Sequence, residues 1–287
     1  MSLFKDTTIL IVTFKSEKII FKTLKNISKK FKILIAENSN NVILKKKIEK
    51  KYLNCKVFNT GKNLGVSKAI NFLLKKVNTK YSIFITPDAF PAKDCFDKLY
   101  NVAKKINNAA ILSPNNKLEK EKKLYGFYNS KEKDINSSND IINVDWVLGG
   151  VMFFNNNHLK KIGYFDENFF LDYEEIDLCL RAKKNFFNVL FCKKIFTYNL
   201  KHQSSDQNYF MLKKLRAWHH GWSMHYFYKK HFILKKYLKF PLLILVTTIV
   251  KFFYQLTRLD TNKMTIHLFF INGFLNSLLK KKSNFRI

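Results

Sequence analysis

Residues 8–14, TILIVTF, form an apolar, β-branched run of the kind that predicts a buried strand. The segments that separate this run from the next ones have the apolar spacing of amphipathic helices. Strands that alternate with helices predict an α/β fold with a mostly parallel sheet and helices on both faces. The expected strands are 8–14, 32–38, 55–59, 81–86 and 109–113, and the expected helices are 16–28, 42–51, 66–77 and 94–106.

Polar residues follow the expected strands at their carboxyl ends, where sheets of this kind bind ligands. They are Thr13, Glu37 with Asn38, and Pro87 with Asp88. An aspartate at position 88 can hold a divalent metal that bridges a diphosphate. A carboxylate at position 37 can accept a hydrogen bond from a nucleotide base or a ribose hydroxyl. Both positions are equally open to interpretation as ordinary turn residues.

The loop GKNLG (61–65) opens the helix expected at 66–77. A helix N-terminus offers backbone N–H groups and a positive dipole end to phosphate. Asn63, Gly65 and Asn71 are candidates for ordering this loop, and Lys68 is expected near the phosphates.

The middle of the chain predicts a polar excursion over 115–143 and then a strand, VDWVLGGVMFF (144–154). The pair Gly149–Gly150 inside that strand indicates a bulge or the close approach of a ligand. Two further strands, within 188–199, lead to His202. His202 is either a structural histidine or, together with Asp88, part of a metal site.

The block FDENFFLDYEEIDLCLR (165–181) sets many acidic residues among aromatic ones in a basic chain. Acidic side chains are rarely buried unless they are paired or bind something. On a helix starting near Glu174, that residue shares a side with Asp177 while Glu175 points elsewhere. One glutamate can then act as a general base, and Asp177 can brace Arg181 at i+4. The alternative is acidic compensation of the helix dipole.

The composition of the chain is strongly basic, with 52 Lys and Arg against 21 Asp and Glu, a net charge of +31 in 287 residues. Such a charge indicates either polyanion or anionic-membrane binding, or the codon usage of an AT-rich genome. The four cysteines are scattered, which indicates reduced thiols in a cytoplasmic protein. Because residues 1–6 lead straight into the first expected strand, we expect no signal peptide.

The C-terminal part, from about residue 206, is basic and aromatic. Its apolar run Phe240–Val250 is flanked by lysines and is shorter than the roughly 20 residues that a bilayer requires. Two interpretations remain open: a helix at the membrane interface, or a buried helix of a C-terminal bundle.

Taken in order, ILIVTF, AENSN, NLGVSKAIN, TPD, WVLGGVMFF and GYFDENFFLDYEEIDLCLR resemble family-2 glycosyltransferases with the GT-A fold, especially the rhamnosyltransferase-like branch. The resemblance runs over roughly residues 7–205. It implies a nucleotide-sugar donor (dTDP-, UDP- or GDP-linked), Mg²⁺ or Mn²⁺ as cofactor, and an inverting single displacement.

The resemblance also implies roles for individual residues. Asp88 would help hold the metal, with His202 as a possible further ligand, and Glu37 and Asn38 would lie by the nucleoside base. Glu175 matches the family's usual aspartate base, with Glu174 as the alternative. Trp146, Gly149, Gly150 and Asp172 would lie near the sugar and the acceptor. Glutamate replaces the family's aspartate at positions 37 and 175, which leaves nucleotide identity and the base open.

The sequence therefore predicts a GT-A domain over 1–205 and a helical extension over 206–287. The expected protein is a cytoplasmic glycosyltransferase, peripheral on the inner face of the membrane, that transfers sugar to a saccharide or lipid-linked acceptor. A nucleotidyltransferase is the first alternative, but VTFKSEK (12–18) lacks the glycine-rich loop it needs. A non-catalytic basic binder of nucleic acid or membrane is the second. It leaves the acidic block unexplained, and no nucleic acid is expected as a partner.

Overall fold

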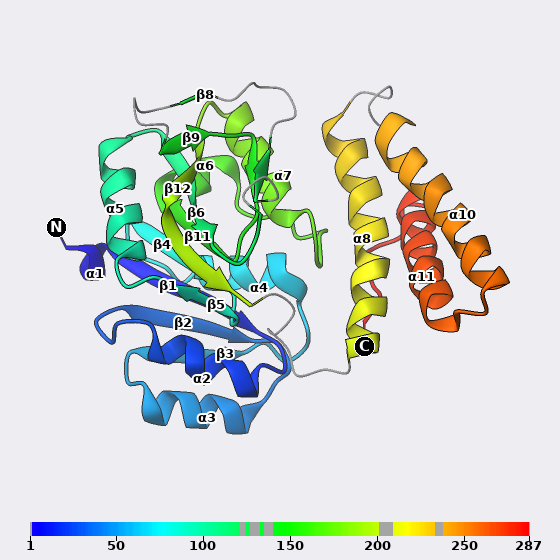
Figure 1. Ribbon diagram of the computed structural model, residues 1–287. Helices are drawn as coiled ribbons and strands as arrows, with labels where there is room; N and C mark the ends of the chain where they lie inside the picture. Colours follow the sequence, from blue (N-terminus) through cyan, green and yellow to red (C-terminus); the bar gives the residue numbers. More distant parts are fainter. Residues whose placement is uncertain are drawn as a thin grey trace. The chain divides into compact units, whose positions relative to one another are not determined.

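The computed structural model describes residues 2–120, 124–126, 133–134, 140–200, 209–232 and 238–286 (Figure 1). The chain divides into two compact units. The first consists of Met1–Leu64, Lys68–Asp166 and Glu175–Asp206, and the second of Gly65–Ser67, Glu167–Glu174 and Gln207–Ile287. The expected boundary between residues 205 and 206 lies outside the described residues.

The N-terminal half of the first unit is a parallel sheet in the order β3-β2-β1-β4. Its strands are β1 (Thr7–Thr13), β2 (Lys32–Glu37), β3 (Cys55–Asn59) and β4 (Tyr81–Ile85). The apolar runs that predicted these strands are buried on both faces: Ile9, Leu10 and Ile11 of β1 are all completely buried. Near-continuous apolar sequence is what a strand covered on both sides requires.

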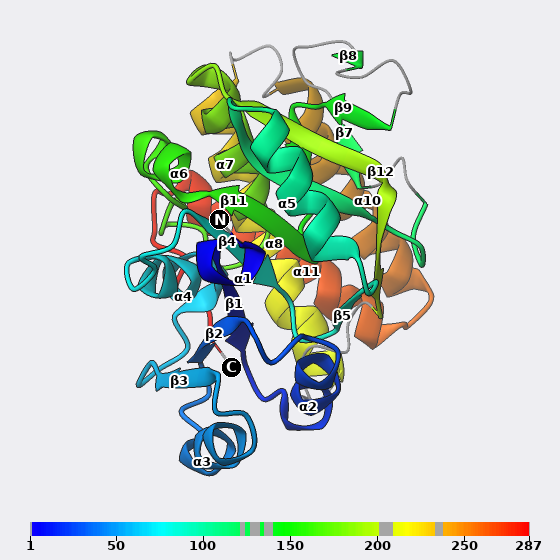
Figure 2. The same ribbon diagram turned by 90° about the vertical axis from the view of Figure 1, so that its left-hand side faces the viewer.

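Helices cover both faces of this sheet (Figures 1 and 2). On one face, side chains of α2 (Glu17–Lys25), α3 (Val42–Lys51) and α5 (Cys95–Lys105) share a hydrophobic cluster with β-strand residues such as Ile9 and Ile11. The other face is covered by α4 (Gly65–Leu74), α6 (Asn156–Ile162) and α7 (Glu174–Lys184). The expected α/β fold is confirmed.

Beyond β4 the sheet becomes mixed. Strand β11 (Val151–Asn155) runs antiparallel between β4 and β6 (Ala109–Asn116), and β12 (Asn188–Asn199) is parallel to β6. Shorter strands extend this edge: β5 (Ala89–Pro91), β8 (Lys133–Asp134) and β9 (Ile141–Asn143). The parallel arrangement predicted from the alternating pattern thus applies to the N-terminal strands, and local periodicity does not reveal strand direction farther on.

Two strand predictions change. The stretch 144–154 is not one strand: β10 (Trp146–Val147) pairs with β7 (Tyr125–Gly126) in a separate two-stranded sheet, and β11 begins after Gly150. The glycine pair therefore separates two strands that join different sheets. Conversely, 188–199 is a single strand, β12, whose register with β6 shifts between Cys192 and Phe196. The short helix α1 (Leu3–Asp6) precedes β1.

The second unit is built on α8 (Tyr209–His231), α10 (Leu243–Thr257) and α11 (Thr261–Leu278), with a π-helical turn η2 (Leu238–Leu242) before α10. Helices α8 and α11 approach closely at two glycines. A Cβ on Gly221 would lie 2.2 Å from the Phe270 carbonyl oxygen, and one on Gly273 would lie 1.9 Å from that of Trp218. The expected C-terminal helical extension is confirmed, and only glycine fits at these contacts.

Helix α10 corrects the expectation that its apolar run is too short to cross a bilayer, and it decides against one of the two interpretations of that run. With η2 it forms an apolar helix, Lys239–Thr257, of 19 residues and mean hydropathy 1.6, which by length and composition is enough to cross a membrane. It is longer than the run 240–250 because apolar residues continue to Leu256. Only 6% of the apolar stretch of this helix is buried, so the interpretation as a buried bundle helix is wrong.

Candidate active site

The carboxyl edge of the first three strands brings together the polar residues that the sequence analysis placed there. The register pairs Thr13 of β1 with Glu37 of β2, and Glu37 with Asn59 of β3. All three strands are parallel, so their last residues form one row along a single edge of the sheet. Asn59 ends the expected strand 55–59 and was not singled out as a candidate ligand contact.

Glu37 is fully buried, and its carboxylate is engaged by its own loop. Oε1 accepts hydrogen bonds from the backbone N–H (3.1 Å) and the hydroxyl of Ser39, and Oε2 accepts one from the Asn41 N–H at 2.6 Å. Asn41 in turn caps α3 by accepting from the Leu44 N–H. Glu37 therefore braces the turn between β2 and α3. Its contact with a nucleoside base stays a prediction.

Asn38 lies next to that turn and is also buried. Its backbone N–H donates to the Thr13 carbonyl oxygen at 2.8 Å, which continues the pairing of β1 and β2 past the end of the strands. Its side-chain oxygen accepts from the hydroxyl of Thr60 at 3.0 Å. These bonds fix the backbone at the edge of the sheet where a ligand is expected.

Asp88, after β4, lies where three chain segments converge. It is 4% exposed, and its carbonyl oxygen accepts from the Leu200 N–H at 3.0 Å. The preceding Thr86 donates its N–H to the Gly150 carbonyl oxygen at 2.9 Å. A Cβ on Gly150 would lie 2.3 Å from Nδ2 of Asn199. The end of β4, the glycine pair and the end of β12 are thus in contact, and the side chain nearest to Gly150 is that of Asn199. The close approach of a ligand to the glycine pair stays a prediction.

The metal prediction depends on Asp88 and His202, and His202 lies outside the described residues. Within the described ranges, no three His, Cys, Asp or Glu side chains form a group that could hold a metal ion. Asp88 itself is a buried oxygen donor, which suits hard cations such as Mg²⁺ and Mn²⁺. The residue present therefore fits the expected kind of ion.

The loop before α4 is packed against the acidic block within the second unit. Gly65 has φ +78°, and a Cβ there would lie 2.4 Å from the ring of Phe170. The N–H of Val66 donates to the Phe170 carbonyl oxygen at 2.8 Å. Only glycine fits at position 65, because both its backbone conformation and its surroundings exclude a side chain. Lys68 is exposed, and Asn63 is half-buried.

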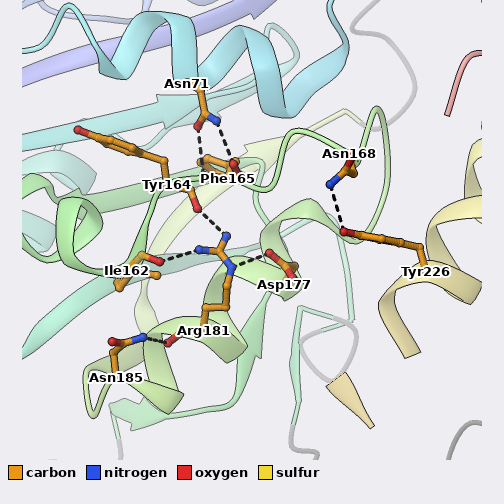
Figure 3. Close-up of polar contacts among 9 residues, drawn as sticks. All are labelled: Asn71, Ile162, Tyr164, Phe165, Asn168, Asp177, Arg181, Asn185 and Tyr226. Carbon is orange, nitrogen blue, oxygen red and sulfur yellow. Dashed lines mark hydrogen bonds and ion pairs between the residues drawn. The ribbon is translucent and has the colours of Figure 1, made fainter. Parts of the chain in front are cut away.

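Asn71 and Arg181 clamp the chain that enters the acidic block (Figure 3). Asn71 bonds both backbone groups of Phe165, donating to the carbonyl oxygen at 2.9 Å and accepting from the N–H at 3.1 Å. Arg181 donates to the carbonyl oxygens of Ile162 (2.9 Å) and Tyr164 (2.5 Å). Its Nε lies 2.8 Å from the carboxylate of the fully buried Asp177, the i, i+4 pair expected from the sequence. Asn71, expected near the donor, therefore positions the backbone at Phe165.

The candidate bases open α7. Glu174 is its first residue and is 6% exposed, and Glu175 is half-buried. Asp172 and Tyr173, just before them, both have left-handed backbone conformations, with φ of 66° and 69°. Such conformations are uncommon for residues other than glycine and persist where surrounding contacts hold them.

Helix α8 supplies those contacts in the second unit. Its Ser223 hydroxyl donates to the Leu171 carbonyl oxygen at 2.9 Å, and His220 Nδ1 lies 3.1 Å from the Asp172 carboxylate. The Phe170 ring stacks on His219 at 4.4 Å. Asn168 donates to the Tyr226 hydroxyl at 3.1 Å (Figure 3). The sequence analysis missed these α8 residues, because partners some 50 positions apart leave no local signal.

Trp146, predicted near the sugar, lies in β10 against β7. A Cβ on Gly126 would be 2.5 Å from its ring. Gly149 is packed on Met152, whose sulfur would lie 2.5 Å from a Cβ at that glycine. The positions of these residues relative to a sugar stay predictions.

The fold defines the class of protein: a mixed sheet with helices on both faces and a polar carboxyl edge, as in GT-A glycosyltransferases. The chain belongs to Glycosyl transferase family 2, whose family model matches residues 8–163. The predicted family is thus confirmed, and the protein is a glycosyltransferase.

Relatives agree with this assignment. The chain is 25% identical over 204 residues to the low-salt glycan biosynthesis hexosyltransferase Agl10 of Haloferax volcanii, a match that covers 66% of each protein. It therefore spans about two thirds of the length of that curated relative.

Solved structures show the same fold. The mannosyltransferase PcManGT from Pyrobaculum calidifontis, in complex with GDP-Man and Mn²⁺, has a TM-score of 0.61 at 11% identity, over 96% of this chain and 88% of the other. GalNAc-T7 with UDP, GalNAc and Mn²⁺ has a TM-score of 0.56 at 12% identity, over 82% and 56%. TarS 1–349 of S. aureus has 0.54 at 16% identity, over 74% and 64%.

Proposed function

We propose that this glycosyltransferase moves a hexosyl unit from a nucleotide-sugar to a hydroxyl group of a saccharide or lipid-linked acceptor, with inversion at the anomeric carbon. The observation that carries the proposal is the buried Asp88 at the carboxyl end of β4, in contact with the segments of Gly150 and Leu200, in a chain of this family. Ligands of open α/β sheets bind at this edge.

Asp88 would hold Mg²⁺ or Mn²⁺, with His202 as a further ligand. When bound, such an ion neutralises charge on the leaving diphosphate. The Mn²⁺ in the PcManGT and GalNAc-T7 structures supports the choice of a divalent cation.

Glu175 is the proposed base. It takes the proton of the acceptor hydroxyl while that oxygen attacks the anomeric carbon, and the nucleoside diphosphate leaves with the electron pair of the broken bond. The N-terminus of α7 favours an ionised carboxylate, the form that can accept a proton. Glu174, one residue earlier in the same turn, is the alternative base.

The donor is proposed to be a GDP-, UDP- or dTDP-linked hexose. GDP-Man and UDP in the structural relatives, and the hexosyltransferase Agl10, support a hexose donor without selecting the nucleotide. Membership of the rhamnosyltransferase-like branch is part of the proposal and does not by itself select the sugar. Glu37 and Asn38 would contact the base, and the half-buried Trp146 with Gly149, Gly150 and Asp172 would line the sugar and acceptor side. We further propose a cytoplasmic location, peripheral on the membrane, in cell-surface glycan synthesis.

The test is a panel of GDP-, UDP- and dTDP-hexoses with the purified full chain and Mg²⁺ or Mn²⁺. Donor binding is followed by thermal shift and turnover by release of nucleoside diphosphate. We expect one nucleotide class to stabilise the protein and to be hydrolysed slowly without acceptor. Absence of both effects across the panel contradicts the proposal.

A further inference from the structure

One exposed face of α10 is apolar along the length of the helix. Leu243, Val246, Val250 and Phe253 follow the 3-4-3 spacing of one helix face, and each is between 55% and 62% exposed. The opposite side packs along α11 and contains Thr248, the buried residue of α10. We call these four exposed residues the apolar stripe. Continuous exposed apolar area of this kind marks an interaction surface.

The charge around the apolar stripe selects the kind of partner. Lys251 of α10 is exposed, as are Lys239 before the helix and Arg258 directly after it. Residues 207–287 contain a single acidic residue, Asp260, whose carboxylate lies 2.9 Å from the Lys263 ammonium. Apolar side chains bordered by cations, without competing acidic groups, match an anionic lipid surface, where acyl chains lie below negative headgroups.

Tyr254 adds a second feature of membrane-interface helices. It is 54% exposed, and its hydroxyl accepts a hydrogen bond from Arg258 Nη1 at 3.0 Å. A ring with a polar tip is suited to the boundary between acyl chains and headgroups. The Tyr254–Arg258 pair thus lies where the apolar stripe meets the cationic border.

The arrangement of the second unit decides how the helix meets the bilayer. Helix α11 follows α10 after a short turn and packs both along α10 and along α8 (Figures 1 and 2). If α10 crossed the bilayer, the turn with Asp260 and Lys263 would have to pass through it. Helix α11 would then return through the lipid together with α8, which carries Lys213, Lys214 and Arg216. Charged residues at that depth are costly.

We infer that α10 docks side-on in the headgroup and acyl boundary of an anionic membrane, with the apolar stripe toward the acyl chains. This inference names the surface that would give the peripheral membrane location proposed above, and its role in the function rests on that proposal. It would hold the enzyme at the surface that carries a lipid-linked acceptor. Vesicle binding needs no donor, so it can fail while donor binding succeeds.

The first experiment is flotation of the full chain with phosphatidylcholine vesicles, with and without phosphatidylglycerol. We expect binding to the anionic vesicles, at least tenfold weaker binding for Val250→Asp/Phe253→Asp, and little change for Leu53→Asp. Leu53 is the matched control because it is a 94% exposed apolar residue of the first unit. Absence of wild-type binding, or equal binding by the double variant, overturns the inference. Retained donor binding in the variants excludes misfolding and leaves the proposed function standing.

The second experiment distinguishes side-on docking from a spanning helix. Lys239→Cys and Asn262→Cys place thiols at exposed positions just before and just after α10 in the chain. The four native cysteines are buried, and burial raises the pKa of the Cys55, Cys179 and Cys192 thiols to about 12, so they react slowly. On sealed vesicles, an impermeant maleimide is expected to label both variants. Labelling of only one overturns side-on docking.

A second copy of the chain is the other conceivable occupant of the apolar stripe. Light scattering without vesicles measures this directly. A dimer that Val250→Asp/Phe253→Asp converts to monomer, together with no vesicle binding by the wild type, overturns the membrane inference. A wild-type monomer that binds vesicles supports it.

Discussion

Strand β1 and helix α10 are both apolar runs, yet the protein uses them in opposite ways. Ile9, Leu10 and Ile11 of β1 are completely buried, whereas Val246 and Val250 of α10 are more than half exposed. Apolar composition alone therefore does not define a core. The two elements differ in their surroundings. Strand β1 has strands on both edges and helices on both faces, while α10 packs on α11 and its other side is exposed in the described part of the chain.

The two units also contain residues with different expected roles. Unit one contains the row Thr13, Glu37 and Asn59, Asp88 and the proposed base Glu175. Unit two contains the loop 167–174 that leads into α7, together with the helix that holds it. The comparison predicts that changes in unit one affect chemistry and core stability. Changes in unit two should affect loop geometry and surface attachment.

The largest effect is expected at the proposed base. Glu175→Gln keeps the shape of the side chain but cannot accept the proton, so transfer should fall by about 10²–10⁴-fold. Donor binding, measured by thermal shift, should stay close to that of the wild type. Glu174→Gln is the matched control. If it loses the larger share of transfer, Glu174 is the base and Glu175 is not.

A pair of substitutions tests the comparison of the two apolar runs directly. Ile11→Ala should lower the free energy of unfolding by about 2–5 kcal/mol, because it leaves a cavity in the core. Val250→Ala should change it by less than about 0.5 kcal/mol, because its side chain is already in water. Urea unfolding followed by circular dichroism measures both. A comparable loss for both variants contradicts the assignment of α10 as a surface helix.

The sequence predicted the elements whose signals are local. The strand 8–14 is a contiguous apolar run, the helix 42–51 matches α3, and Asp177 with Arg181 is an i, i+4 contact within one helix. The row at the carboxyl edge was also predictable, since parallel strands end at the same edge.

The sequence did not predict contacts between distant segments. Strand direction at β11, the bond from Asn71 to Phe165 94 residues later, and the pairing of Asp172 with His220 all depend on tertiary structure. The left-handed backbone conformation of Tyr173 was also not predictable, since tyrosine has no preference for that conformation. The exposure of α10 depends on which helices pack beside it, and a hydropathy pattern does not contain that information.

A smaller effect is expected in unit two at Gly273. Alanine is the better helix former by about 1 kcal/mol, which would stabilise α11 if there were space. The added Cβ would lie 1.9 Å from a backbone oxygen of α8, which cannot move without shifting the helix. We therefore expect Gly273→Ala to destabilise by about 1–3 kcal/mol. Leu268→Ala, at a half-exposed position of the same helix, is the control. A stabilised Gly273→Ala contradicts the close packing.

The smallest effect concerns the dependence of stability on pH in unit two. Burial lowers the pKa of His220, but the hydrogen bond to Asp172 and the charge of that carboxylate together raise the pKa by more, so the net shift is upward. A folded-state pKa above the unfolded one means that stability is present below the unfolded pKa, about 6.5, and is lost as the pH rises through the folded value. The pair is substantially exposed, so about 0.5 kcal/mol or less is expected.

His219 and His225 should act in the opposite direction. Burial is the main cause that lowers the pKa of each to about 4, so the folded state binds fewer protons than the unfolded chain between there and pH 6.5. Stability should therefore rise from pH 4 to 6.5 and decline slightly above it. Melting temperatures across this range measure both limbs. His220→Gln should flatten only the upper limb, because the two buried histidines stay in place. An unchanged upper limb means that the Asp172 contact does not hold the loop in solution.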